Sequence, residues 1–161
     1  MIRNATRADL PAIVAIYNAS IPGRMATADT EPVSLESRLP WFEAHAPDRY
    51  PLWVIDRDGA VAAWLDVHPF HGRPAYRATV EVSVYVAPNA QKKGLARALL
   101  RELLAKAPSL GIKTVLAVIF AHNTKSVRLF SSEGFTTWGT LPRVAELDTI
   151  ERDVVILGRR L

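Results

Sequence analysis

The stretch TVEVSVYV at residues 79–86, followed by QKKGLA at residues 91–96, decides the fold of this chain. In the first stretch valines alternate with polar residues, among them Glu81, and this period of two predicts a β-strand with one apolar and one polar face. Leucines at helical spacing over residues 95–104 predict an amphipathic helix. The turn between them is basic and contains Gly94, so its amides can point at an anion where the helix begins. A carboxylate beside an anion site favours group transfer from a phosphate-bearing cofactor.

The length of 161 residues predicts one domain, spanning residues 1–161, with a single substantial core. Hydrophobic residues make up 49% and charged residues 22% of the chain, as in ordinary globular proteins. There is no cysteine, which excludes disulfides, thiolate nucleophiles and cysteine-ligated metals. The N-terminus has no apolar segment and no apolar run approaches about eighteen residues, so we expect a cytoplasmic protein without a membrane partner.

The formal charge of +4 is compatible with binding to nucleic acid or to a phosphorylated cofactor. Basic residues are scattered, except for a local cluster at Lys92, Lys93, Arg97 and Arg101. Aromatic residues are not interleaved with them as a base-stacking surface requires, so we expect no nucleic-acid partner. The histidines lack metal-ligand spacing with nearby carboxylates, and we therefore expect no metal.

The remaining pattern predicts a mixed α/β fold in the order β-α-α-β-β-β-α-β-α-β-β. Helices are expected after the caps Thr6 and Ser34, from Leu95 to Ala107, and from Asn123 to Ser132 before Gly134. The predicted strands are Ile2–Ala5, Leu52–Ile55, Val61–Val67, Val80–Val86, Lys113–Phe120, Thr136–Leu141 and Val154–Leu157.

The turn at residues 91–96 resembles the Q/R-x-x-G-x-G/A signature of the GNAT N-acetyltransferases. Asn123, Ser126 and the EGF sequence at residues 133–135 are similar to the second helix of that family. The resemblance implies one central, mostly antiparallel sheet flanked by helices, and acetyl-CoA as the acetyl donor. It implies that the amides of the turn bind the pyrophosphate and that the second helix contacts the pantetheine arm. The implied cofactor-binding residues are Val84, Tyr85, Val86, Gln91, Lys92, Lys93, Gly94, Leu95, Ala96, Asn123, Ser126 and Phe130.

A closer resemblance, to the phosphinothricin N-acetyltransferase branch, covers nearly the whole chain. It is carried by residues 27–32, 41–42, 72–76, 79–86 and 138–142. The resemblance implies a cytoplasmic homodimer that acetylates the α-amino group of phosphinothricin, methionine sulfoximine, methionine sulfone or a related amino acid. Three features depart from the family pattern: Ala96 in place of glycine, Phe130 in place of a tyrosine or histidine, and Ala145–Asp153 without the usual glycine and tryptophan pattern.

Glu81 is the candidate general base for the attacking amine, because burying a carboxylate in the middle of a partly covered strand face costs free energy unless the carboxylate has a partner or a function. The alternatives are a solvated glutamate or an ion pair with Arg77. An α-amine with a pKa of about 7.7–8.0 is deprotonated at a cost of about 1 kcal/mol at neutral pH, against about 4–5 kcal/mol for a lysine. A single carboxylate therefore suits an α-amine that attacks the thioester directly, without an acyl-enzyme.

Phe130 removes a side-chain acid from the position where the family carries one. A CoA thiol with a pKa near about 8.5, by analogy with cysteine, can leave as the thiolate. Tyr85 could donate a proton instead, although a packing role is equally compatible with the sequence. The strand amides around Val84–Val86 are better candidates for polarising the thioester carbonyl.

Arg73, Tyr76 and Arg77 are candidate substrate-binding residues, mainly on the resemblance. Four strand residues span about 13 Å, so Arg77 and Glu81 could hold opposite ends of a small zwitterion. An arginine fork suits a carboxylate or a phosphinate. The alternative is that these are surface arginines. The four tryptophans are expected in the core or the pocket wall, with Trp64 the candidate for substrate contact.

Two other functions remain open. The acceptor could be a peptide or protein amine, although a lysine would demand a stronger base. The chain could also be a non-catalytic CoA-binding module, for which Phe130 is the best indication.

Overall fold

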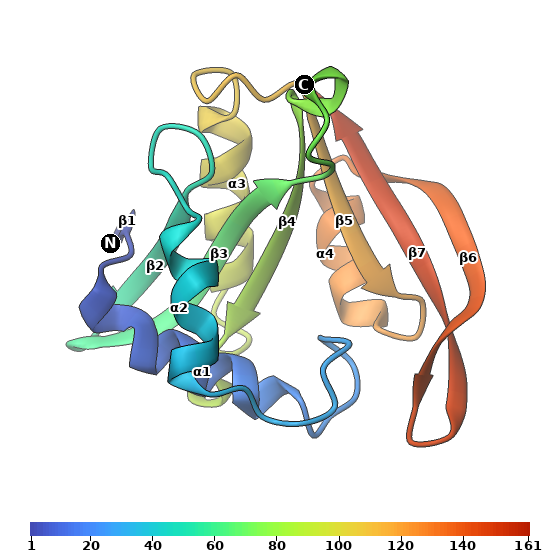
Figure 1. Cartoon of the computed structure of the whole chain (residues 1–161), viewed down its shortest axis with the longest axis horizontal. Helices are drawn as coiled ribbons and strands as arrows, with labels where there is room; N and C mark the ends of the chain where they lie inside the picture. The colour runs from blue at the N-terminus through green and yellow to red at the C-terminus, as the bar shows by residue number, and fades with distance from the viewer.

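The computed structural model describes residues 1–161, and its centre is one seven-stranded sheet (Figure 1). The strand order is β1-β2-β3-β4-β5-β7-β6, and every neighbouring pair is antiparallel except β4 and β5. The strands are β1 Ile2–Asn4, β2 Leu52–Arg57, β3 Ala60–Pro69, β4 Thr79–Val86, β5 Thr114–Phe120, β6 Thr136–Leu147 and β7 Ile150–Arg160. The helices are α1 Leu10–Ser20, α2 Leu35–Glu43, α3 Leu95–Lys106 and α4 Thr124–Ser132. The predicted fold class and order of elements are confirmed.

The helices cover both faces of the sheet, with α1 and α2 in front and α3 and α4 behind in Figure 1. Behind the sheet, the valine face of β4 packs on the leucines of α3, and Val80, Leu99 and Leu103 are fully buried. In front, a smaller core joins Ile13 of α1 to Trp64 of β3. Because side chains alternate along β4, the polar residues of this strand share the front face with the smaller core.

Local signals in the sequence explain several chain reversals. Ser34 caps α2, its Oγ accepting a hydrogen bond of 3.1 Å from the N–H of Ser37. Asp58 and Gly59 both have positive φ, 53° and 79°, as a tight two-residue hairpin requires. The predicted cap at Ser34 and the predicted hairpin turn at residues 56–59 are confirmed. Strand β2 extends two residues, and strand β3 one residue, closer to this turn than expected.

The last hairpin is longer than the sequence indicated. The expected strands Thr136–Leu141 and Val154–Leu157 continue to Leu147 and over Ile150–Arg160. Most of β6 is exposed and its pairing slips twice, so no apolar alternation marks it. The expectation that Trp138 lies in the core or pocket is wrong: the side chain is 48% exposed and covers Gly158, where a Cβ would lie 2.2 Å from its ring.

None of the helices is both long and apolar enough to span a membrane.

Candidate active site

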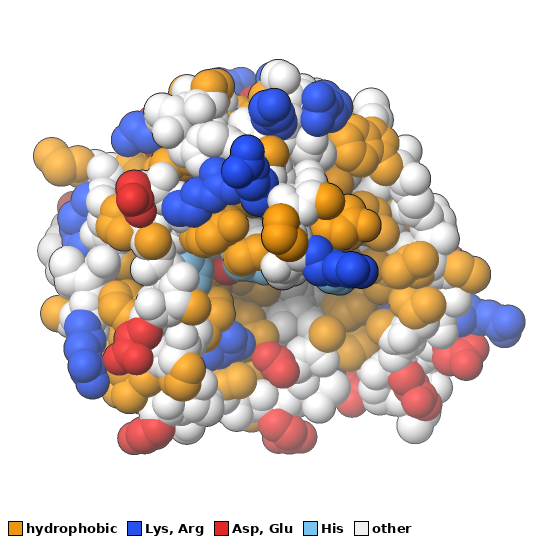
Figure 2. Space-filling model, turned by 45° about the horizontal axis from the view of Figure 1, so that its top comes forward, with side chains coloured by type: hydrophobic (Ala, Val, Ile, Leu, Met, Phe, Trp, Pro, Cys, Tyr) orange, Lys and Arg blue, Asp and Glu red, His pale blue; other side chains and the backbone are white.

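The site begins where β4 and β5 separate in the middle of the sheet. The two strands pair only over Thr79–Glu81 and Thr114–Leu116, although both continue for several more residues. Beyond that point residues 82–85 and 117–120 line opposite walls of a cavity of about 460 Å³. The space-filling view shows the molecule hollowed near the middle of one face, with Lys and Arg side chains above the hollow (Figure 2). In β4 alternate N–H groups point toward β3 and toward β5, so those on the β5 side have no strand partner here. The gap is closed at Glu81 and opens toward the carboxyl ends of both strands.

The basic turn lies at the open end of this gap, because β4 ends at Val86 and α3 begins at Leu95 (Figure 1). We call residues 91–94 the anion turn. Lys92 and Gly94 adopt the left-handed conformation, with φ of 62° and 76°. The residues of this turn are exposed, and nothing lies within 4 Å of a Cβ built on Gly94. The first N–H groups of α3 lack helical partners, so the turn and helix can bind an anion.

Glu81 lies at the closed end of the cavity and its side chain is 28% exposed. Its Oε2 is 3.4 Å from Nε2 of His68, the residue opposite it on β3. The alternative pairing of Glu81 with Arg77 is wrong, because the ion-pair partner of Glu81 is His68. The expectation that Arg77 lies on the same strand as Glu81 is also wrong, because Arg77 follows the short 3₁₀ turn Pro74–Tyr76 and the strand begins at Thr79. The carbonyl of Arg77 instead accepts a hydrogen bond from Arg49.

His68 and Asp66 are site residues that the sequence reasoning missed. Asp66 is buried, and its Oδ2 is 3.0 Å from Nδ1 of His68 and 3.7 Å from Nε2 of His45. Burial alone would lower the pKa of His68, but the hydrogen bonds to Asp66 and Glu81 outweigh it and raise that pKa to about 10. Burial opposes ionisation of Asp66, yet its histidine partners hold the pKa of this carboxyl below its usual value. The available signal was an Asp-x-His pair in an otherwise apolar strand, which puts both side chains on one face.

Tyr85 lines the cavity and also packs into the front core. Its ring stacks on Trp64 at 4.5 Å between centroids and meets the ring of Tyr17 edge-on at 5.3 Å. Its hydroxyl donates to the carbonyl of Ala26 at 3.3 Å, and burial raises its pKa. Trp64 is 3% exposed and does not line the cavity, so it supports Tyr85 from behind.

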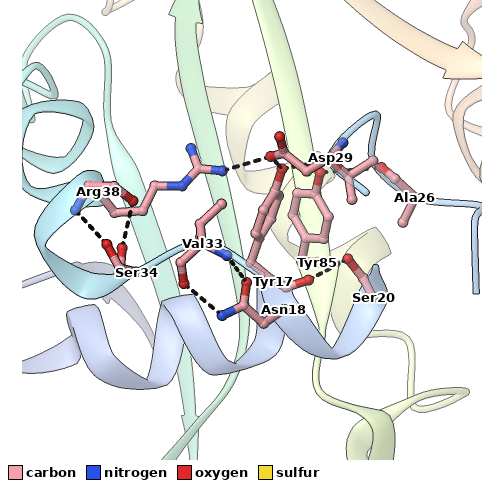
Figure 3. A network of polar contacts seen from close by, with 11 residues as sticks. Tyr17, Asn18, Ser20, Ala26, Asp29, Val33, Ser34, Arg38 and Tyr85 are labelled. Carbon is pink, nitrogen blue, oxygen red and sulfur yellow. Dashed lines mark hydrogen bonds and ion pairs between the residues drawn. The ribbon is translucent and has the colours of Figure 1, made fainter. Parts of the chain in front are cut away.

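The chain between α1 and α2 covers the front of the cavity, and we call residues 21–33 the acceptor segment. Figure 3 shows how it is held: the hydroxyls of Tyr17 and Tyr85 point toward it, and Arg38 reaches it from α2. Tyr17 contacts Thr27 Oγ1 at 2.6 Å and donates to Asp29, which also pairs with Arg38 at 3.4 Å. Met25, Ala26, Thr27 and Ala28 of this segment line the cavity.

Three residues of the second helix motif meet the cavity from α4. Asn123 caps this helix, its Oδ1 accepting from the N–H of Ser126 at 3.2 Å. Its Nδ2 donates to the carbonyl of Met25 at 3.0 Å, which ties the acceptor segment to α4. Phe130 is 3% exposed and its ring meets that of Phe135 edge-on at 5.0 Å. Phe130 thus forms an apolar wall at the position where the resemblance in the sequence implies an acid.

The structure does not bring every predicted site residue to this cavity. Glu81, Val84, Tyr85, Asn123, Ser126 and Phe130 line it. Val86 and residues 91–96 lie outside its walls. Arg73, Tyr76 and Arg77 are exposed in the connection between β3 and β4, where Tyr76 packs against Phe70 and His71.

Comparison with known proteins agrees with this arrangement. The model of the acetyltransferase (GNAT) family matches residues 12–135. A Bacillus subtilis (strain 168) protein, provisionally named a phosphinothricin acetyltransferase, is 49% identical over 161 residues, which are 99% of this chain and 98% of the relative. An L-methionine sulfoximine/L-methionine sulfone acetyltransferase of Pseudomonas paraeruginosa is 39% identical, over 90% of this chain and 85% of the relative. The crystal structure of a Sinorhizobium meliloti phosphinothricin acetyltransferase in complex with acetyl-CoA superposes with a TM-score of 0.93 at 32% identity, over 100% of this chain and 88% of that one.

The central sheet that separates beside a glycine-containing anion turn is thus shared with acetyltransferases, one of which is crystallised with acetyl-CoA. The chain belongs to the GNAT family of acetyltransferases. It is an N-acetyltransferase, as the resemblance in the sequence indicated.

Proposed function

We propose that this enzyme transfers the acetyl group of acetyl-CoA to the α-amino group of a small amino acid or analogue. The leading acceptors are phosphinothricin, methionine sulfoximine and methionine sulfone, which are the substrates named for its relatives. The observation that carries the proposal is the position of Glu81, at the closed end of a gap that opens toward the anion turn. A linear cofactor held at the turn would bring its far end to this carboxylate.

The cofactor residues follow from the same arrangement. The amides of the anion turn and the first turn of α3 bind the pyrophosphate, and Lys92 and Lys93 add positive charge. The pantetheine arm lies in the gap, against the unpaired amides of β4 around Val84–Val86. Asn123, Ser126 and Phe130 form the wall on the α4 side. Acetyl-CoA, when bound, supplies the thioester carbon that the amine attacks.

In the reaction the amine nitrogen attacks this carbon directly, and Glu81 accepts the proton that the nitrogen loses. The unpaired N–H groups of β4 polarise the carbonyl oxygen. CoA leaves as the thiolate. Because the corresponding thiol has a pKa of about 8.5, by analogy with cysteine, its departure needs no strong acid, and the apolar Phe130 is tolerated. The hydroxyl of Tyr85 donates to Ala26 rather than to the gap, which favours packing as its role.

We propose that Arg73, Tyr76 and Arg77 bind the anionic groups of the acceptor in a homodimer, since they lie outside the cavity of their own chain. An apolar surface on the last hairpin supports self-association. Trp138, Leu141, Val144 and Ile150 are 48%, 42%, 57% and 51% exposed. Leu141 and Val144 also line the cavity, so this surface borders the site. Light scattering after gel filtration tests the dimer, and a monomeric mass at micromolar concentration would contradict it.

The test of the proposed function is release of the CoA thiol from acetyl-CoA across a panel of amino acids. The panel contains L-amino acids, phosphinothricin, methionine sulfoximine and methionine sulfone, with a lysine peptide for comparison. Glu81→Gln should lower kcat about 100-fold or more while acetyl-CoA binding, measured by calorimetry, stays intact. Glu36→Gln, an exposed position of α2, is the matched control. Unchanged turnover in Glu81→Gln would exclude this base, and turnover with the peptide alone would move the acceptor to a protein amine.

A further inference from the structure

Three ionisable side chains, each in contact with the next, form a chain that connects a buried part of the sheet to the cavity. Asp66 and His68 lie two residues apart on β3, and Glu81 lies opposite His68 on β4. The contacts are 3.0 Å from Asp66 Oδ2 to His68 Nδ1 and 3.4 Å from His68 Nε2 to Glu81 Oε2. The imidazole therefore spans the distance between a buried carboxylate and the carboxylate at the end of the cavity.

The inner end of this chain is firmly anchored. The side chain of Asp66 is 4% exposed and its ionic partners are His68 and His45. A carboxylate at such a depth is retained only when it is paired, so Asp66 orients the ring of His68 through its Nδ1. Both ring nitrogens then act as donors, as they do in the imidazolium, and the raised pKa of His68 agrees with this state.

The outer end is held by one contact only. His68 is the only ion-pair or hydrogen-bond partner of Glu81, and it contacts a single carboxylate oxygen. The other oxygen has no protein partner, and Glu81 borders the cavity. The arrangement leaves one oxygen restrained and one available to a bound amine.

We propose that His68, anchored by Asp66, is a positioning residue that fixes the carboxylate of Glu81 for proton removal from the acceptor amine. The proposal rests on the proposed function, in which Glu81 is the base. The proton of the attacking nitrogen goes to the free oxygen of Glu81, while His68 keeps both of its own protons. After the transfer the imidazolium favours the charged form of the carboxyl, so the proton is passed on to water and the base is restored.

A purely structural ion pair would produce a different result in a double-mutant cycle. The four proteins are the wild type, His68→Gln, Glu81→Gln and the double variant, with kcat, acetyl-CoA affinity and Tm measured for each. If His68 acts through Glu81, His68→Gln lowers kcat about tenfold in the wild type and causes no further loss in the Glu81→Gln protein. Acetyl-CoA affinity should stay within about twofold, because a residue near the closed end does not contact the anion turn.

The other outcomes are distinct. An equal loss of kcat in both backgrounds, or no loss in His68→Gln, would overturn the role of His68. No loss in Glu81→Gln would instead exclude Glu81 as the base, on which the proposal rests, while absence of all turnover with small amino acids in the wild type would overturn the proposed function. Nitrogen NMR of the His68 ring gives a second readout. The ring should stay doubly protonated well above neutral pH in the wild type and should titrate lower in Asp66→Asn. A ring that titrates near its ordinary value of about 6.5 in the wild type would show that the two carboxylates do not hold it, and would overturn the proposal.

Discussion

The anion turn and the acceptor segment flank the same cavity, yet they are held in opposite ways. The anion turn depends on its own backbone: Lys92 and Gly94 adopt positive φ, and the side chains of residues 91–94 are exposed. The acceptor segment depends on side chains from elsewhere in the chain. Tyr17 of α1, Arg38 of α2, Tyr85 of β4 and Asn123 at the start of α4 all bind it.

Under the proposed function, the anion turn serves the cofactor and the acceptor segment serves the acceptor. A short backbone motif can present the same amides to any CoA derivative, because the pyrophosphate is constant. A segment assembled from several elements can be reshaped by changes in any of them, which suits recognition of a variable acceptor. Changes at the turn should therefore affect the cofactor, and changes at the contacts of the segment should affect the acceptor.

The largest effect is expected from Gly94→Val. A β-branched residue at φ 76° costs about 1–3 kcal/mol, and relief of that strain would turn the amides away from the anion. Acetyl-CoA affinity, measured by calorimetry, should fall at least tenfold. Gly59→Val is a matched control, because Gly59 has φ 79°, equally open surroundings and a place in the β2–β3 turn. A similar loss of affinity in the control would show that the effect comes from general destabilisation.

Asp29→Ala should produce the next largest effect, on the acceptor. The substitution removes the partner shared by Tyr17 and Arg38, so the acceptor segment loses two of its contacts. With about 0.5–0.7 kcal/mol lost for each such contact at a partly exposed site, KM for the amino acid should rise about five- to tenfold. Steady-state kinetics should show KM for acetyl-CoA unchanged. An equal rise in both constants would contradict the separation between the two regions.

Lys92→Gln combined with Lys93→Gln should weaken acetyl-CoA binding by a smaller amount. These exposed charges are screened, and each contributes about 0.2–0.7 kcal/mol. The dissociation constant should rise about two- to tenfold at low salt, and the difference from the wild type should shrink at high salt. Titrations at two ionic strengths check this, and a difference that does not depend on salt would show that the lysines act through conformation.

The smallest effect is expected from Asp148→Asn. Asp148 pairs with Arg24 of the acceptor segment at 2.9 Å, but its side chain is 62% exposed. An exposed pair of this kind contributes about 0–1 kcal/mol, so Tm should change by no more than a few degrees and KM for the acceptor by less than twofold. A larger change in KM would mean that the last hairpin holds the acceptor segment in place.

The fold could be predicted from the sequence where the structure is local, and less well where it depends on distant parts of the chain. The strand at residues 80–86 and the helix after it were readable because their apolar periods are local and because Val80 and Val82 of the strand pack on buried leucines of the helix. The last hairpin was underestimated because β6 is exposed and irregularly paired, which removes the alternation that marks a strand. Its length is set by pairing with β7, and sequence patterns do not carry that information.

The same limit applies to the candidate site. Glu81 and the anion turn could be proposed from the sequence because the strand, turn and helix that position them are consecutive in the chain. The network of Tyr17, Asp29 and Arg38 was not found, because its members come from two helices and the segment that connects them and no spacing links them. The contact between His68 and Glu81 depends on the register between β3 and β4, which the sequence analysis did not assign.

The separation of β4 from β5 also bears on aggregation. Unpaired backbone on a strand is a template for pairing with another chain, and proteins protect it at the borders of their sheets. Here residues 82–85 pair only with β3 and residues 117–120 pair only with β7, so the edges that face each other in the middle of the sheet are unpaired. The gap between these edges is closed at one end, where Glu81 pairs with Leu116. A foreign strand would have to stop there and would meet neighbours on both sides, whereas a thin flexible ligand could enter. The enzyme can therefore keep backbone groups open to a ligand without presenting them to other proteins.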